Sequence, residues 1–370
     1  MKPDGAALPL NKIWSSWTKP KVFPRKDQSK LTSTKYKVAL SAWAALLLLI
    51  CFGLGYPALN RYDPTSIPGL SDSLQYYRLV QSGPAAAAGH WKYRVLVPYL
   101  AKPIYWMVRG RLGSWDPTAF ALLIINSIFC AATAFLVSIL VYGMSRKSTM
   151  AVLAAFAYLL NFTVSNYQLS ALVDSADAFF FALLTWALLR NQWMLLLLIA
   201  LLAALSKETF VPIATVFALT WLLLEPADKK KKFLAVIAMA VVGLSTVSVL
   251  HSAIDHNLVF PWNVLSQEHA AGSVATSVFH VVAGWNLWMT IIWLPFVFLA
   301  ARYIPKQWYW AALAAALTTL VLFVYNDPGP DPTRPFLSAG NIGRPIFDVA
   351  GPLFAASFAF AVEAFRHNEA

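Results

Sequence analysis

The chain has 370 residues, of which 59% are hydrophobic and 12% charged, and its formal net charge is +12. Soluble domains average about 45–50% apolar and about 25% charged residues, and a core of this size could not bury so much apolar surface. The composition therefore excludes a disordered chain, a small disulfide scaffold and a soluble enzyme. It predicts an all-α polytopic membrane protein whose positive charge lies on the cytoplasmic side, not at a nucleic-acid interface.

The apolar runs predict one transmembrane domain over residues 38–365, between a basic tail at 1–37 and a short C-terminus at 366–370. The tail carries nine Lys and Arg residues, which places the N-terminus in the cytoplasm. Runs long enough for a bilayer predict about ten spans, which returns the C-terminus to the cytoplasm. The expected spans are 38–59, 117–142, 149–168, 233–251, 278–300, 308–325 and 346–365, with three shorter helices at 176–190, 192–206 and 210–224.

The first outer loop, 60–116, is the longest and includes an apolar segment at 94–112. Reading this segment as a span would place Lys102 near the bilayer centre, at a cost of about 2.5–3.5 kcal/mol. We therefore expect an amphipathic helix on the membrane surface. The resulting inner segments hold 19 of the 29 basic residues, and the short outer loops favour the inner membrane of a bacterium. Cys51 and Cys130 fall in apolar runs, as buried small hydrophobes do.

Most groups able to do chemistry fall on the predicted outer face. No Gly-rich phosphate loop of the Walker or Rossmann spacing occurs in the chain. The acids and bases lie beside short helices, which indicates a cavity for a polar or anionic group. The candidate residues are Asp63, Asp72, Arg94, Asp174, Asp177, Lys207, Glu208, Arg334 and Arg344.

The order of short motifs resembles a known family. Arg61-Tyr62-Asp63 opens the first outer loop, and Ser71-Asp72-Ser73-Leu74-Gln75-Tyr76-Tyr77 follows it. The segments Tyr93-Arg94-Val95-Leu96-Val97-Pro98-Tyr99-Leu100 and Leu205-Ser206-Lys207-Glu208-Thr209 come later. Together these motifs and the architecture of most of the chain look like the GT-C superfamily of integral-membrane glycosyltransferases.

This resemblance implies a hexosyl- or pentosyltransferase that moves a sugar from a polyprenyl-phosphate carrier to an acceptor glycan, lipid or protein at the outer face. An acceptor hydroxyl needs a base, for which Asp72 is the first choice and Asp63 the second. The departing phosphate needs cations, for which Arg94, Lys207, Arg344 and Arg334 are candidates. The family often holds a divalent cation such as Mg²⁺ or Mn²⁺, and acceptor or metal roles are assigned to Asp174, Asp177 and Glu208.

Each assignment has a structural alternative. Asp72 could cap a helix through a capping box with Gln75, and Asp63, followed by Pro64, could start a turn. The pair at Asp174 and Asp177 could cap the following helix. Arg94 could be solvated or paired with a headgroup, Lys207 and Glu208 could form an internal ion pair, and the loop arginines could be solvated.

Two other classes of function also fit the sequence. A transporter or lipid flippase needs intramembrane charges and broken helices as well, although no internal repeat of the kind common in transporters is visible. A non-catalytic subunit of a cell-envelope assembly complex is the third possibility.

Overall fold

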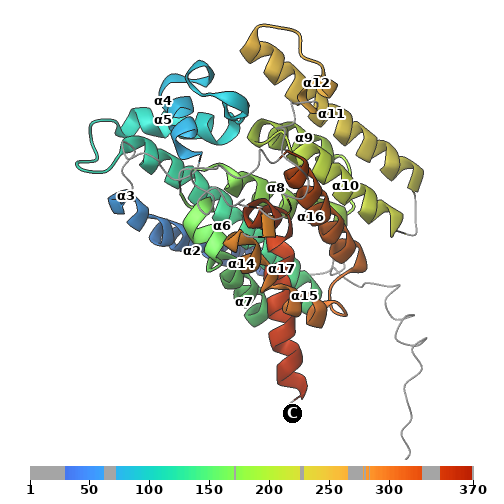
Figure 1. Ribbon diagram of the computed structural model, residues 1–370. Helices are drawn as coiled ribbons and strands as arrows, with labels where there is room; N and C mark the ends of the chain where they lie inside the picture. The colour runs from blue at the N-terminus through green and yellow to red at the C-terminus, as the bar shows by residue number, and fades with distance from the viewer. Residues whose placement is uncertain are drawn as a thin grey trace, which may run out of the picture.

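A computed structural model describes residues 30–61, 72–170, 172–225, 229–265, 278, 281–282, 284–326 and 342–368. Within these ranges the chain is all-helical and has no strand (Figure 1). The predicted all-α class is therefore confirmed. Asp63 and Arg334 lie outside the described residues.

Within the residues that the structure describes, five helices are long and apolar enough to cross a membrane, as a multi-pass membrane protein requires. They coincide with five of the predicted spans, whereas the other predicted spans correspond to shorter helices, so the count of about ten stays a prediction. The five are α2 (Lys30–Gly55), α6 (Pro117–Ser145), α11 (Lys229–Asp255), α16 (Lys306–Asn326) and α17 (Gly343–Asn368).

The apolar region 174–224 folds as three short helices, as its two polar interruptions predict. They are α8 (Asp174–Leu189), α9 (Leu195–Ser206) and α10 (Phe210–Leu223). Residues 207–209 separate α9 from α10 and carry Lys207 and Glu208. This break in the helical backbone lets charged side chains enter the bundle between two apolar segments.

Two predicted spans are wrong as continuous helices. The span at 149–168 is α7 (Ser148–Leu159), followed by a π-helical turn, η4 (Val164–Gln168). Asn161 Oδ1 accepts a hydrogen bond from the backbone N–H of Thr163 at 2.8 Å, and this local bond competes with continued α-helix. The span at 278–300 contains α14 (Trp285–Ile291) and α15 (Leu294–Ala300), and Pro295 in the first turn of α15 cannot continue the preceding hydrogen-bond ladder.

The described part of the predicted first outer loop and the residues just before it fold into small helices at one end of the molecule. They are α3 (Pro57–Arg61), α4 (Ser73–Ser82), η2 (Pro84–Ala86), η3 (Gly89–Tyr93) and α5 (Leu96–Val108). The predicted surface helix at 94–112 is α5, which packs on α4 and α6. Figure 1 shows α4 and α5 toward the same end as α12 (Pro261–Leu265), opposite the C-terminal end of α17.

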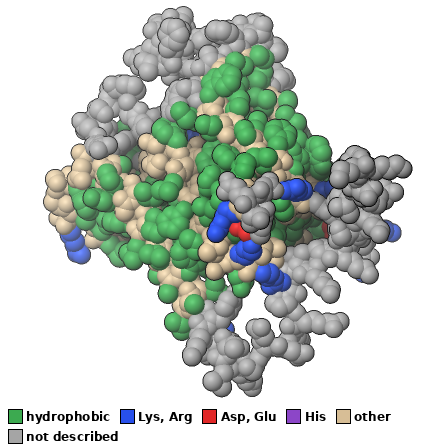
Figure 2. All heavy atoms as spheres, turned by 90° about the horizontal axis from the view of Figure 1, so that it is seen from below, with side chains coloured by type: hydrophobic (Ala, Val, Ile, Leu, Met, Phe, Trp, Pro, Cys, Tyr) green, Lys and Arg blue, Asp and Glu red, His purple; other side chains and the backbone are tan. Residues whose placement is uncertain are grey.

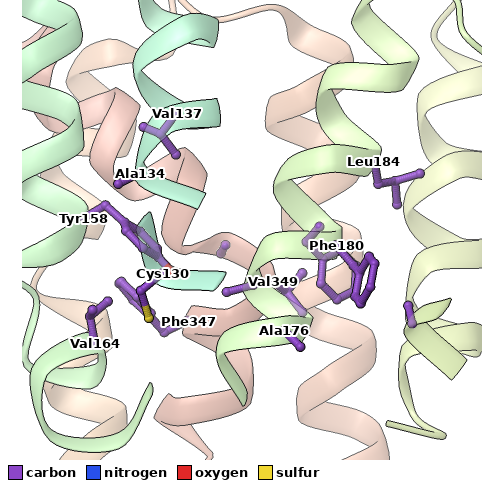
Figure 3. Packing of buried hydrophobic residues seen from close by; sticks show 14 of the residues in the cluster. Cys130, Ala134, Val137, Tyr158, Val164, Ala176, Phe180, Leu184, Phe347 and Val349 are labelled. Carbon is purple, nitrogen blue, oxygen red and sulfur yellow. The ribbon is translucent and has the colours of Figure 1, made fainter. Parts of the chain in front are cut away.

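Helix α17 lies at the centre of the bundle and contacts α6, α7, α8, α14, α15 and α16. Its Phe347 stacks against Tyr158 of α7, with ring centroids 5.8 Å apart, beside the fully buried Cys130 of α6 (Figure 3). Outer side chains remain apolar as well, as Leu49 is 69% exposed. Viewed from the end where α17 terminates, apolar side chains cover much of the described surface, and several Lys and Arg side chains lie near its centre, with others toward the edges (Figure 2).

Helices α9, α10 and α11 pack through small and branched residues. Gly243 of α11 approaches Val211 of α10 so closely that a Cβ atom on residue 243 would lie 2.8 Å from both Val211 methyl groups. Val211 is buried and has few alternative rotamers in a helix, so it cannot easily turn away. The short axial separation of α10 and α11 therefore depends on glycine at this position.

We expect Gly243→Ala to lower the unfolding free energy by about 1–3 kcal/mol, because the added methyl group overpacks the α10–α11 contact. Gly53→Ala is the matched control, since nothing lies within 4 Å of a Cβ atom built at that helical glycine. The melting temperature in detergent measures the stability of each variant. Equal melting temperatures for the two variants would contradict the assigned packing.

Candidate functional site

The candidate site lies where the N-terminal ends of α4, α8 and α17 meet the break between α9 and α10. Arg344, the second residue of α17, joins two of these ends: its Nη2 atom is 3.3 Å from Asp72 Oδ2, and its Nε atom is 3.2 Å from Asp174 Oδ2. Asp72 immediately precedes α4, and Asp174 is the first residue of α8. Carboxylates at helix N-termini are favoured by the helix dipole, so the local fold helps to hold both acids.

Lys207 inserts from the α9–α10 break into a group of three aspartates. Its Nζ atom is 3.0 Å from Asp174 Oδ1, 3.4 Å from Asp177 Oδ2 and 3.9 Å from Asp348 Oδ2. All four side chains are less than 10% exposed. An uncompensated charge at such a position is costly, so the ammonium group and the aspartates depend on one another.

Arg94 and Glu208 form a second buried ion pair beside the first group. The Nη2 and Nε atoms of Arg94 donate to the two carboxylate oxygens of Glu208 at 2.7 and 3.2 Å, and Nη1 donates to Tyr76 Oη at 3.2 Å. A forked contact of this kind fixes both side chains. Arg94 is 6% exposed and precedes α5, so it is not the solvated arginine of a surface helix.

A chain of hydrogen bonds continues from the aspartates into the bundle. Gln168 Nε2 donates to Asp348 Oδ1 at 2.7 Å, and Tyr158 Oη donates to Gln168 Oε1 at 2.7 Å. Gln168 ends the π-helical turn that follows α7, so the interruption of that predicted span brings an amide to the site. Both Gln168 and Tyr158 are fully buried.

The accessible side of this assembly is formed by Asp72 and Glu208. Their side chains are 20% and 16% exposed, whereas that of Asp174 is 2% exposed. His90 of η3 lies near this side. Its burial and the positive charge of Arg94 lower its pKa to about 4, so the imidazole is neutral at neutral pH and adds no positive charge.

The two neighbouring ion-paired groups together hold eight charged residues, five acids and three bases, which gives a formal net charge of −2 if all are ionised. The acids are Asp72, Asp174, Asp177, Glu208 and Asp348, and the bases are Arg94, Lys207 and Arg344. We call this set the polar cluster.

The structure brings together seven of the nine residues expected from the sequence, and the other two, Asp63 and Arg334, lie outside the described residues. Asp72 is the N-cap residue of α4, but its side chain accepts no capping hydrogen bond and pairs with Arg344 instead. The two neighbours in the α9–α10 break bind different partners, because Lys207 contacts aspartates and Glu208 contacts Arg94.

Asp348 is the functional candidate that the sequence analysis missed. It lies in the sixth position of α17, inside a predicted span. Glu363 is the other acid of this helix and lies near its end, whereas Asp348 is followed by fourteen residues without a charge. An acid beside such an apolar run is itself the signal that could have identified it, because ionisable residues within spans mark functional sites.

Among the described residues, no group of three or more His, Cys, Asp or Glu side chains has a geometry that could hold a metal ion. The Lys207 ammonium takes the place among the aspartates that a cation would occupy. The described residues do not fit the divalent cation that the resemblance implies, and we derive no chemical step through one.

A separate contact fixes the segment before α5 against α11. Lys92 forms an ion pair with Asp255 at the end of α11, and the hydroxyl of Tyr93 donates to the same carboxylate. Because Lys92 and Tyr93 precede Arg94 directly, this contact holds the backbone from which Arg94 enters the polar cluster.

No protein-family model matches the chain, and no curated protein or solved structure matches it. A function is therefore argued from the geometry and chemistry of the site.

We expect Lys207→Met to lower the unfolding free energy by about 3–5 kcal/mol, because it leaves buried carboxylates without their ammonium partner. Lys147→Met is the control: it removes an ion pair to Glu363 from a lysine that is 48% exposed, and we expect a loss below about 1 kcal/mol. Thermal unfolding in detergent compares the two.

Adding Asp348→Asn to the Lys207→Met variant removes one of the unpaired carboxylates, so part of the lost stability should return. If Lys207→Met unfolds at the same temperature as the Lys147→Met control, Lys207 does not hold the cluster together.

Proposed function

We propose that the protein transfers a sugar from a polyprenyl-phosphate carrier to an acceptor hydroxyl at the outer face of a membrane, with Asp72 as the base. The observation that carries this proposal is the ion pair between Asp72 and Arg344, which lie 272 positions apart in the chain. It brings a partly accessible carboxylate and a guanidinium group to one place, and glycosyl transfer from a phosphate requires one of each.

Accessibility favours Asp72 over the other acids as the base. The buried Asp174 and Asp177 contact Lys207 and are out of reach of an acceptor that stays near the surface. Glu208 is comparably exposed, but both its oxygens are engaged by Arg94. Asp72 has the most exposed carboxylate of the polar cluster, so an acceptor hydroxyl reaches it more easily than the other acids.

The reaction transfers one proton and replaces the bond between the sugar and the phosphate with a bond between the sugar and the acceptor. The acceptor oxygen attacks the anomeric carbon and its proton passes to Asp72. The bond from that carbon to the phosphate oxygen breaks, and the phosphate leaves with the bonding electrons. These steps need a positioned base and a positive charge near the leaving oxygen.

Arg344 couples the action of the base to the stabilisation of the leaving phosphate through its charge. It contacts both Asp72 and Asp174, so its positive charge is shared between two carboxylates before the reaction. When Asp72 takes up the proton, its negative charge disappears and Arg344 loses one anionic partner. The guanidinium then has more positive charge to offer the departing phosphate, which also suits its forked geometry.

Arg94 and Lys207 have narrower roles in this scheme. The carboxylates described above as their partners do not include Asp72, so proton uptake by Asp72 releases no positive charge on either residue for the phosphate. Lys207 holds Asp174 beside Arg344, and Arg94 holds Glu208 at the accessible side. We propose positioning roles for both residues.

The opening of the cluster toward the first outer loop supports a site on the non-cytoplasmic side. In the orientation set by the basic N-terminal tail, this side faces away from the cytosol. Lipid-linked donors are accessible there and nucleotide sugars are not. The inner membrane of a bacterium remains our proposed location.

We expect Asp72→Asn to reduce transfer by about 10²–10⁴-fold, because the amide cannot take the acceptor proton. Asp116→Asn is the control in the same loop, since Asp116 caps α6 by accepting from the N–H of Ala119, and asparagine caps equally well. The assay incubates detergent-purified protein with a panel of polyprenyl-phosphate sugars and a cell-envelope extract that supplies acceptors, and it measures consumption of the donor.

The competing functions give different outcomes in the same preparation. The hydrogen-bonded path from Asp348 to Tyr158 enters the bundle, as a transporter also requires. Substrate uptake into proteoliposomes without a covalent product would overturn the enzyme proposal in favour of a transporter or flippase. A folded chain that consumes none of the donors would favour a non-catalytic assembly subunit. Wild-type transfer by Asp72→Asn would remove Asp72 from the chemistry.

A further inference from the structure

Helix α5 has two unlike faces. Val97, Ala101 and Tyr105 repeat every fourth residue and are buried, so this face packs against the neighbouring helices α4, α6 and α9. The other face is exposed and apolar. It presents Tyr99 and Leu100 near its start and Trp106 and Met107 near its end, with exposed fractions between 45% and 63%.

Basic side chains are interleaved with these exposed aromatic residues. The Lys102 Nζ atom lies 5.6 Å from the ring centroid of Tyr99 and 5.4 Å from that of Trp106. The spacing of three and four residues places all three side chains on one side of the helix. Arg109 follows at the end of α5, 5.9 Å from the Tyr105 ring, and Arg111 comes two residues later.

The sequence that contains α5 carries charge of one sign between Asp72 and Asp116. Residues 73–115 contain six Lys and Arg residues and no Asp or Glu. Two of the six, Lys92 and Arg94, form ion pairs with distant carboxylates. Within the described residues, Lys102, Arg109 and Arg111 form no ion pair with a carboxylate, which distinguishes them from the bases of the polar cluster.

We propose that the exposed face of α5 and the adjoining Arg109 and Arg111 bind the headgroups of anionic phospholipids. The aromatic rings and the apolar Leu100 and Met107 suit the boundary between headgroups and acyl chains, where tyrosine and tryptophan are enriched. The basic groups extend from the same region toward the phosphates. Each Lys or Arg near an anionic surface contributes about 1 kcal/mol of attraction.

The combination of exposed apolar and basic groups favours a lipid surface over an acidic protein. A protein partner would have to cover Tyr99, Trp106 and Met107, whereas the chain already has the long apolar helices of a membrane protein beside α5. The proposal does not depend on glycosyl transfer, because it concerns residues outside the polar cluster.

The test places a fluorophore on α5 and compares quenching by two spin-labelled lipids. Met107→Cys can be labelled selectively because the native Cys51 and Cys130 are fully buried. The full-length labelled protein is placed in nanodiscs of phosphatidylcholine with a minor fraction of either spin-labelled phosphatidylglycerol or spin-labelled phosphatidylcholine. The ratio of the two quenching efficiencies reports the local preference for the anionic headgroup.

We expect the anionic lipid to quench several-fold more efficiently, and we expect Lys102→Gln to reduce this preference without removing it, because Arg109 and Arg111 remain. Lys102→Arg should retain it, and the triple variant Lys102→Gln, Arg109→Gln, Arg111→Gln should abolish it. High salt should lower the preference of the labelled protein that retains Lys102, Arg109 and Arg111, because salt screens their charges. A label at Leu49→Cys, on the exposed side of α2, should show equal quenching by both lipids throughout.

Equal quenching by the two lipids at residue 107 would overturn the proposal, as would an unchanged preference in the triple variant. If the triple variant does not fold, Lys102→Gln and the salt titration still decide. A preference that is equally strong at residue 49 would show a general attraction to the whole protein and would also contradict a site on α5.

Discussion

The arrangement of the site depends on one ammonium group surrounded by three aspartates inside an apolar helix bundle. Lys207 contacts residues of α8 and α17 from the break between α9 and α10, so it joins three parts of the chain that apolar packing alone would not align. Hydrophobic contacts are non-directional, whereas an ion pair in a low-dielectric interior has a large energetic penalty when its geometry fails. The polar cluster therefore sets the relative positions of helices that the apolar core only holds together.

Interruptions of the helices make this cluster possible. The chain leaves α-helical geometry before Lys207, after α7 and at the start of α17, and each of these points supplies a polar side chain to the site. Irregular backbone at membrane depth is tolerated where it is buried in protein, since its polar groups then find partners. The π-helical turn that ends at Gln168 is an example, because its side chain bridges Tyr158 and Asp348.

The sequence could predict the helical class and most of the candidate residues, because both follow from local composition. The break at Lys207 and Glu208 is visible as two charges between apolar runs, and Asp174 is visible as an acid that opens one. The pairing was not predictable, since Arg344 reaches Asp72 only through the packing of α17 against distant helices. Asp348 was missed because its span is otherwise apolar enough to look structural.

The fate of each positive charge follows from the dielectric environment around it. Inside the bundle, Arg94, Lys207 and Arg344 each face a carboxylate, because burial without one would cost several kcal/mol. On α5, Lys102 faces aromatic rings at a surface, where water or headgroups can solvate an ammonium group. In the proposed reaction a donor phosphate adds negative charge to a cluster that already holds more acids than bases. Proton uptake by Asp72 offsets part of that charge, so base catalysis and stabilisation of the leaving group are linked through the same ion pair.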